Sequence, residues 1–271
     1  MRRITIPLAA LVVLGGCAVS TQQEVQLGQQ AAQQVAAQLP LLQDPEVDGY
    51  VNQLGTRIAS NTSRRDLDWH FAVVNSDIVN AFALPGGFIY VNRGVLEHAD
   101  NESELAGVLG HEIEHVVRRH SVKQMEQVQG ANVGVALACA LTNVCQSQAA
   151  QAAIQVGGAA VFAKFSRQDE IQADEGGFHN VVNAGINPTG MLTFFQKLLA
   201  EEQQQGGGAS GVSAWFSDHP GTQDRIADIQ RMLGQMSQQQ LAALSMDSPD
   251  FQAMKRRLAQ LPAAPPPPRT Q

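Results

Sequence analysis

The chain has 271 residues, of which 44% are hydrophobic, so its length suits one sizeable domain or two small ones with a packed core. Aromatic residues make up only 5%, and the many alanines and glutamines favour helix over sheet. The formal net charge is -7, and this acidic balance argues against a nucleic-acid partner or a charge-driven attachment to anionic lipid.

Residues 1–16 read as a secretory signal rather than as part of the folded core. Arg2 and Arg3 precede an apolar run that is too short to span a membrane as a helix. Residues 14–17 (LGGC) resemble a bacterial lipobox, in which Cys17 takes a diacylglyceryl thioether and becomes the mature N-terminus. A plain signal peptide with a chance cysteine is the alternative. Removal of the signal takes away two positive charges and no acidic ones, which moves the net charge from -7 to -9.

The residue after the lipobox bears on the location of the protein. Ala18 stands where, in enteric-type bacteria, an aspartate would retain a lipoprotein in the inner membrane. We therefore expect a lipid anchor at the periplasmic face of the outer membrane of a Gram-negative cell. The membrane contact would then come from acyl chains and not from a charged patch.

Hydrophobic periodicity predicts helices and strands before the central motif. We expect helices over residues 21–38 and 45–60, strands over 68–74 and 87–92, and a turn at 84–87 (LPGG). A long helix is expected over residues 101–127. Asn101 and Glu104 have the spacing of a capping box at its start.

The second half of the chain reads as further helices. Residues 131–165 are small and apolar, and we expect a packed helical hairpin there. A membrane insertion is the alternative, but the first apolar run is short and glutamines interrupt the second. More helices are expected over residues 167–184, 189–203, 225–236 and 248–261, with a flexible loop at 203–213 and a disordered proline-rich tail at 263–271.

Two cysteines follow the lipobox, Cys139 and Cys145. An exported compartment is oxidising, so we expect a disulfide between them. On an unbroken helix they would lie about 240° apart, so the bridge requires a break near Thr142 and Asn143. Two buried free thiols are the alternative.

The sequence HEIEH at residues 111–115 is the strongest chemical signal in the chain. Four residues advance a helix by about 400°, so His111 and His115 lie one turn apart and can bind one ion from the same face. Glu112 lies about 100° from His111, within reach of a metal-bound water but turned away from direct ligation. This spacing is typical of a hydrolytic zinc site. A solvated helix with charged residues is the alternative, but its apolar neighbours indicate burial, where unpartnered polar groups are costly.

Two other polar residues of this helix lie off the ligand face. His120 falls about 180° from His111 on the helical wheel, so we expect it to pack on a second face or at the surface. Glu114 is expected to be structural.

A catalytic zinc ion needs a third protein ligand and one open position. Glu170 and Asp174 are four residues apart and share one face of a predicted helix. Glu170 can bind the ion, and Asp174 can accept a hydrogen bond from a ligating histidine and fix its tautomer. Alone, such an acidic pair is usually a solvated surface, and its weight comes from the HEIEH motif.

HEIEH followed by EIQAD (residues 170–174) resembles the gluzincin peptidase family. This family includes the CAAX prenyl endopeptidases, the HtpX-type heat-shock proteases and the periplasmic lipoprotein proteases of the BepA and LoiP type. Further matching motifs lie at residues 80–91 (NAFALPGGFIYV), at 166–167, at 219–220 (HP) and at 225–226. The resemblance covers about residues 47–236.

The resemblance implies a mainly helical α+β fold: a zincin-type metallopeptidase domain with a small sheet and HEIEH on a central helix. One Zn²⁺ would be held by His111, His115 and Glu170, with Glu112 as the general base. An edge strand beside the cleft, to which an extended peptide can add, would contain Asn80, Ala81, Phe82 and Ala83. A hairpin whose Pro-Gly-Gly only makes a turn is the alternative.

His219 and Arg225 have two interpretations under this resemblance. Both could donate hydrogen bonds to the oxyanion of the scissile carbonyl. Alternatively, His219 fills the open zinc position until substrate displaces it. A loop histidine and a surface arginine remain the simpler alternative.

These features together predict a lipid-anchored zinc metalloendopeptidase of protein quality control. Its substrates would be unfolded, damaged or misassembled envelope proteins, and the outer-membrane assembly machinery would be a further partner. The alternative is a chaperone-like lipoprotein that holds extended clients without turnover; a structural lipoprotein without metal is a third. The predicted parts are a signal peptide (1–16), a lipidated tether and helix (17–44), a metallopeptidase domain (45–247), a C-terminal helix (248–262) and a proline-rich tail (263–271).

Overall fold

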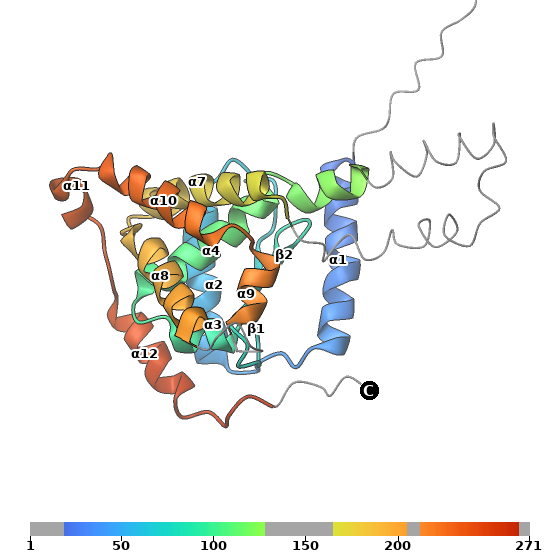
Figure 1. Cartoon of the computed structure of the whole chain (residues 1–271). Coiled ribbons are helices and arrows are strands. Elements are labelled where there is room, and N and C mark those ends of the chain that lie inside the picture. Colours follow the sequence, from blue (N-terminus) through green and yellow to red (C-terminus); the bar gives the residue numbers. More distant parts are fainter. Residues whose placement is uncertain (1–18, 128–164, 205–211, 266–271) are drawn as a thin grey trace, which may run out of the picture.

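The computed structural model describes residues 19–127, 165–204 and 212–265 (Figure 1). Within these residues the chain is mainly helical with one three-stranded sheet, which confirms the predicted fold class. No helix of the described residues is long and apolar enough to cross a membrane. The predicted signal peptide, Cys17, nearly all of the 131–165 hairpin with Cys139 and Cys145, and the end of the tail lie outside the described residues.

Apart from the helix expected over residues 101–127, the predicted longer elements agree with the observed ones to within about three residues. The helices are α1 (Thr21–Gln38), α2 (Pro45–Ala59), α3 (Arg93–His98), α4 (Glu102–Val117), α7 (Arg167–Asn183), α8 (Thr189–Gln204), α9 (Ser213–Asp218), α10 (Thr222–Gly234), α11 (Gln238–Ala242) and α12 (Pro249–Leu258). The strands are β1 (His70–Val74), β2 (Ala81–Leu84) and β3 (Phe88–Asn92). The sequence did not predict the short helices α3, α9 and α11, because one or two turns carry too little periodicity.

The starts of the main helices follow their capping residues. Asp44 and Ser248 cap α2 and α12, each of which has a proline in its first turn. Asn101 caps α4 by accepting from the amide of Glu104 at 3.1 Å. Only this half of the predicted capping box forms, because the Glu104 carboxylate instead accepts from the amide of Asp100 at 2.9 Å.

The sheet has the order β1-β3-β2, which makes β2 a terminal strand among the described residues. β1 runs parallel to β3, and β2 pairs antiparallel with it. Alternate residues point to opposite faces, so Val73 and Val91 enter the main core while Phe82 and Tyr90 stack on the other face. α1 packs on that second face, as Figure 1 shows.

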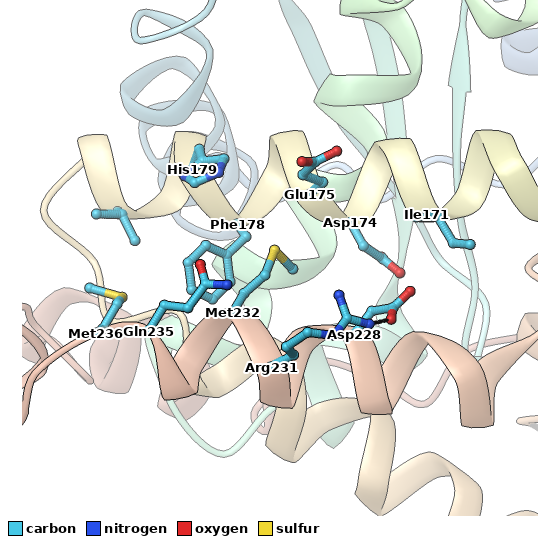
Figure 2. Close-up of a pocket in the computed structure, with 11 residues that line it drawn as sticks. Ile171, Asp174, Glu175, Phe178, His179, Asp228, Arg231, Met232, Gln235 and Met236 are labelled. Atoms are coloured by element: carbon cyan, nitrogen blue, oxygen red, sulfur yellow. Dashed lines mark hydrogen bonds and ion pairs between the residues drawn. The ribbon is translucent and has the colours of Figure 1, made fainter.

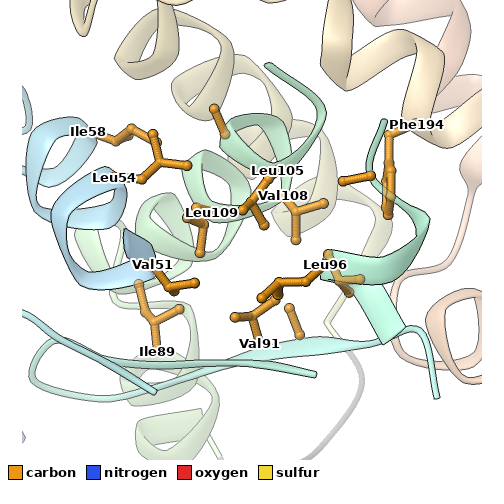
Figure 3. Close-up of a cluster of buried hydrophobic side chains, with 14 of the residues drawn as sticks. Val51, Leu54, Ile58, Ile89, Val91, Leu96, Leu105, Val108, Leu109 and Phe194 are labelled. Carbon is orange, nitrogen blue, oxygen red and sulfur yellow. The ribbon is translucent and has the colours of Figure 1, made fainter. Parts of the chain in front are cut away.

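The core surrounds α4, the helix that carries HEIEH. Its residues Leu105 and Leu109 are fully buried against residues of α2, β3 and α3, and Phe194 of α8 packs at one side (Figure 3). Burial of each such side chain stabilises the fold by about 1.5–3 kcal/mol. The metal motif is therefore held on the most enclosed helix of the domain.

One part of the predicted architecture is wrong: residues 101–127 do not form one helix. α4 ends at Val117, and helix resumes at His120 after a turn in which Arg119 has a φ of 58°. The left-handed region costs a residue with a side chain about 1–2 kcal/mol. Contacts far away in sequence offset this cost, because the Arg119 guanidinium donates to Glu24 of α1 at 2.9 Å and to the carbonyl of Val19.

α4 and α7 approach closely enough that their glycines are required. A Cβ atom on Gly177 would lie 2.8 Å from the carbonyl carbon of Gly110 and 2.9 Å from the amide nitrogen of His111. Both are backbone atoms, so relief would need the two helices to separate. This contact brings the acidic face of α7 to the histidines of α4.

We expect Gly177→Ala to lower the free energy of unfolding by about 1–3 kcal/mol, the usual cost of overpacking. Gly49→Ala is the matched control, since Gly49 is an exposed glycine within α2 whose Cβ would meet nothing within 4 Å. There alanine should stabilise the protein by about 0.5–1 kcal/mol through helix propensity. Chemical denaturation measures both, and equal stability of the two variants would contradict the close helix contact.

Candidate metal site

Four buried side chains from three parts of the chain meet at one point. His111 and His115 come from α4, Glu170 comes from the first turn of α7, and His219 follows α9. One ligating atom from each residue lies within 4.8 Å of the corresponding atoms of the others. None of the four is more than 3% exposed.

The spacing of these atoms fits a divalent cation. The Nε2 atoms of His111 and His115 are 3.0 Å apart, and the Glu170 carboxylate oxygens lie 3.4 and 3.5 Å from them. In a tetrahedral site with Zn–N distances of about 2.0–2.1 Å, neighbouring ligand atoms are about 3.3 Å apart. Within the described part of the chain, Oε1 of Glu170 is buried without a hydrogen-bond donor. Two imidazole nitrogens and a carboxylate that face one another at these distances attract a positive charge, either as a proton on one ring or as a cation between them.

The charges of the site support the same conclusion. Burial alone would raise the pKa of Glu170, but His219, Arg225 and His111 together hold that pKa well below its usual range. Burial and Arg225 would lower the pKa of His111, yet the nearby carboxylates outweigh them and raise it to about 9. Burial keeps the pKa of His115 well below its usual value. The cluster thus combines an ionised carboxylate on Glu170, a neutral imidazole on His115, and the imidazole of His111, whose surroundings favour a positive charge.

Asp174 and Arg225 form the layer behind the ligands. Oδ1 of Asp174 is 2.8 Å from Nδ1 of His111, which is the distance of a hydrogen bond between the two side chains. Arg225 donates to both oxygens of Asp174, at 2.6 and 2.7 Å, and its Nη1 lies 2.8 Å from Glu170. Its guanidinium also stacks over the ring of Phe195 at 4.6 Å. Arg225 is therefore a buried residue that joins the two acidic groups of α7.

His219 lies over the cluster between α4 and the sheet. Its Nδ1 is 3.2 Å from both His111 Nε2 and Glu170 Oε2, and its Nε2 is 3.5 Å from the carbonyl oxygen of Ala81 in β2. The ring of Trp215 packs against it with centroids 4.5 Å apart. The cluster therefore borders β2, which begins at Ala81, one residue after the predicted start at Asn80.

Glu112 is fully buried, and neither carboxylate oxygen has a hydrogen-bond partner among the described residues. Nε2 of His219 lies 3.5 Å from Oε1, beyond good hydrogen-bond geometry. Burial raises the pKa of Glu112. A buried carboxylate without partners is costly, and such groups concentrate at functional sites.

The position predicted for His120 is wrong. The prediction put it on a second face or at the surface, but its Nδ1 is 2.9 Å from Nδ1 of His115, and it is only 2% exposed. The left-handed turn at Arg119 rotates it back towards the site. Glu114, in contrast, has the structural role expected of it, since it binds Arg118 and Asn180. The helical wheel held no signal for His120, because the wheel assumes an unbroken helix.

A separate groove of about 480 Å³ runs between α7 and α10 (Figure 2). Phe178, Met232, Met236 and Asp174 are among the residues that line it. None of the four clustered residues lines it. Through Asp174 the groove adjoins the cluster without containing any of its four members.

A buried helix with HEIEH, a glutamate from a second helix and a bordering terminal strand define a zincin-type metallopeptidase domain. Comparison with known proteins agrees, because the profile of peptidase family M48 matches residues 45–233. The chain belongs to peptidase family M48. This finding confirms both the predicted family resemblance and the metalloendopeptidase class.

Named relatives come from bacteria and from mitochondria. The chain is 33% identical over 249 residues to the beta-barrel assembly-enhancing protease of Escherichia coli K12, covering 89% of this chain and 49% of that protein. It is 26% identical to the metalloprotease LoiP of the same organism, covering 84% of this chain and 95% of that one. The mitochondrial metalloendopeptidase OMA1 of Schizosaccharomyces pombe is 31% identical, with 68% of this chain and 52% of that one covered. The chain thus spans about half the length of the beta-barrel assembly-enhancing proteases that it matches.

Proposed function

We propose that this domain binds one Zn²⁺ through His111, His115 and Glu170 and hydrolyses peptide bonds in extended segments of unfolded or damaged envelope proteins. The observation that carries the proposal is the buried cluster of these three side chains beside the carboxylate of Glu112, which has no hydrogen-bond partner among the residues that the structure describes. Comparison of the zinc-loaded wild type with Glu112→Gln on an unfolded protein substrate tests it.

When bound, Zn²⁺ supplies a Lewis acid that polarises a carbonyl oxygen and lowers the pKa of water to about 7. Glu112 accepts the proton of the attacking water and later donates it to the leaving amine. Its raised pKa suits this exchange, because an acid-base group works best with a pKa near the ambient pH. Asp174 accepts a hydrogen bond from Nδ1–H of His111 and so favours the tautomer in which Nε2, the atom that faces the cluster, carries no hydrogen.

The substrate chain would add to β2. As the terminal strand of the described sheet, β2 can pair with an extended peptide through backbone hydrogen bonds while Ala81 lies next to the cluster. Asn80, just before the strand, donates to Asp218 at 2.8 Å and so ties the end of α9 to this edge. Extended, unfolded segments are the substrates that such an edge accepts.

For Arg225 the contacts favour a positioning role over an oxyanion role. Its donors face Asp174 and Glu170, and it is only 1% exposed. For His219 the contacts favour the gating role, in which its ring fills the open zinc position until substrate displaces it. Its Nδ1 lies 3.2 Å from Nε2 of His111 and 3.2 Å from Oε2 of Glu170, and it would thus fill the fourth position beside the three proposed ligands.

His219→Ala should therefore raise the hydrolysis rate of a short unstructured peptide. If the gate is open about a tenth of the time, its removal raises the rate about tenfold. Initial rates with a fluorogenic peptide measure this, with the exposed His179 of α7 replaced by alanine as the control. A loss of about 10²–10³ in rate would instead assign His219 to the oxyanion.

The cell envelope is the proposed location, with a lipid anchor at Cys17 on the periplasmic face of the outer membrane. The lipobox-like sequence supports the anchor, and the relatives named beta-barrel assembly-enhancing protease support contact with the outer-membrane assembly machinery. A disulfide between Cys139 and Cys145 would suit this oxidising compartment.

Metabolic labelling checks the anchor. Radiolabelled palmitate should enter the full chain in Gram-negative cells, and Cys17→Ser should lose the label and move to the soluble periplasmic fraction. A single acyl chain gives only marginal membrane binding, so stable anchoring requires the full lipid modification. Label retained in Cys17→Ser would contradict the anchor site, with Cys139→Ser as the control.

A further inference from the structure

Nδ1 of His115, the ring nitrogen that does not face the cluster, has a partner with no role in the proposed hydrolysis. His115 directs Nε2 at His111 and Glu170, and its other ring nitrogen, Nδ1, lies 2.9 Å from Nδ1 of His120. We propose that His120 is a positioning residue, which holds the His115 ring in its ligating orientation by accepting a hydrogen bond from Nδ1–H. This inference rests on the proposed role of His115 as a zinc ligand.

The hydrogen-bond directions follow from elementary bookkeeping. Nε2 of His115 must carry a lone pair to bind a cation, so the ring hydrogen resides on Nδ1. Nδ1 of His120 must then accept, which places the hydrogen of His120 on Nε2. Nε2 of His120 has two acceptors nearby among the described residues, Oε1 of Gln172 at 3.3 Å and Oδ1 of Asp169 at 3.5 Å. The assignment is thus consistent from His115 through His120 to α7.

The buried and aromatic surroundings of the two rings strengthen the hydrogen bond between them. The ring of Phe165 stacks on His115 with centroids 4.0 Å apart and lies 5.9 Å from that of His120. Hydrogen bonds strengthen in such a low-dielectric environment, and an unmatched donor there is costly. His115 is 1% exposed, so water reaches its Nδ1 poorly if His120 is removed.

The path of the chain supports a built arrangement. His120 reaches His115 only because Arg119 adopts a left-handed conformation. Glu24 of α1 is fully buried and binds Arg119 at 2.9 Å as well as Arg64 at 3.2 Å. A buried carboxylate shared by two arginines therefore maintains the turn that presents His120.

A matched pair of substitutions tests the inference. His120→Asn keeps an acceptor oxygen near the position of Nδ1, whereas His120→Leu has a similar size and no acceptor. The dissociation constant for Zn²⁺ is measured on the purified full chain by competition with a chromophoric chelator. We expect His120→Leu to weaken zinc binding about 10–100-fold, the usual effect of losing such a partner, and His120→Asn to stay close to wild type. Equal affinity of the two variants would overturn the inference.

The same assay separates this inference from the proposed function. Wild type and Glu170→Gln are titrated in parallel. If they bind zinc alike, the ligand set itself is wrong and the inference falls with it. If Glu170→Gln binds weakly while His120→Leu matches His120→Asn, the zinc site stands and only the role of His120 fails.

A measurement on the unsubstituted protein covers the case in which His120→Leu does not fold. NMR of ¹⁵N-histidine-labelled, zinc-loaded wild type reports the tautomer of each ring. The inference requires the hydrogen of His120 on Nε2 and that of His115 on Nδ1. A hydrogen on Nδ1 of His120 would overturn it, because that ring could not then accept from His115.

Discussion

Glu112→Gln should reduce the rate of peptide hydrolysis by about 10²–10⁴, the usual contribution of a general acid-base group. Glutamine has the same shape but cannot take the proton of the attacking water. Initial rates on an unfolded protein and on a short peptide, followed by mass spectrometry of the fragments, measure the loss. Degradation by the variant at the wild-type rate would rule out Glu112 as the base. Absence of any degradation by the zinc-loaded wild type would leave the chaperone-like alternative.

The same variant should keep its zinc and lose no stability. Glu112 ligates nothing in the cluster, so the affinity for Zn²⁺ should stay close to wild type. Burial raises its pKa, and a carboxyl with a raised folded-state pKa destabilises the fold once pH exceeds the unfolded-state pKa. At pH 7 its neutralisation should therefore leave the melting temperature equal or higher. A lower melting temperature together with lost zinc would mean that the variant disrupts the site instead of the proton transfer.

Much of the candidate site was predictable because its signals are local. The spacing of His111 and His115 is a property of any helix, and so is the pairing of Glu170 with Asp174 on one face. The predicted starts of α2 and α12, at residues 45 and 248, likewise lie within one residue of the observed starts. The convergence of α4 and α7 is not local. It was expected because a catalytic zinc ion needs a third protein ligand, and because the motifs together resemble a known family.

The position of His120 could not be predicted from neighbouring residues alone. No glycine or proline marks a break after Val117, and the turn depends on Glu24, 95 residues from Arg119 in sequence. Only the folded domain brings these charges together. Arg225 is similar, since it lies 51 residues from Asp174 and only the family resemblance singled it out. Helix α9, which leads to His219, was too short to leave a periodic signal.

Glu170→Gln should remove most of the stabilisation that zinc gives to the fold. A ligand at 100 times its dissociation constant stabilises the native state by about 2.7 kcal/mol. If loss of the carboxylate weakens binding about 1,000-fold, the same zinc concentration stabilises by less than about 0.1 kcal/mol. Since 1 kcal/mol corresponds to about 2–4 °C for a chain of 150–250 residues, zinc should raise the melting temperature of the wild type by about 5–10 °C and that of the variant hardly at all.

The comparison with Glu175→Gln makes this test specific. Glu175 lies on the same helix and is exposed, so its substitution removes an identical charge without touching the cluster. Melting curves of all three proteins, with and without zinc, separate loss of a ligand from loss of a charge on α7. The Glu175 variant should keep the full zinc-dependent shift. An equal shift in Glu170→Gln would mean that the ion lies elsewhere, because a residue that binds the metal cannot lose its carboxylate without weakening the coupling between binding and folding.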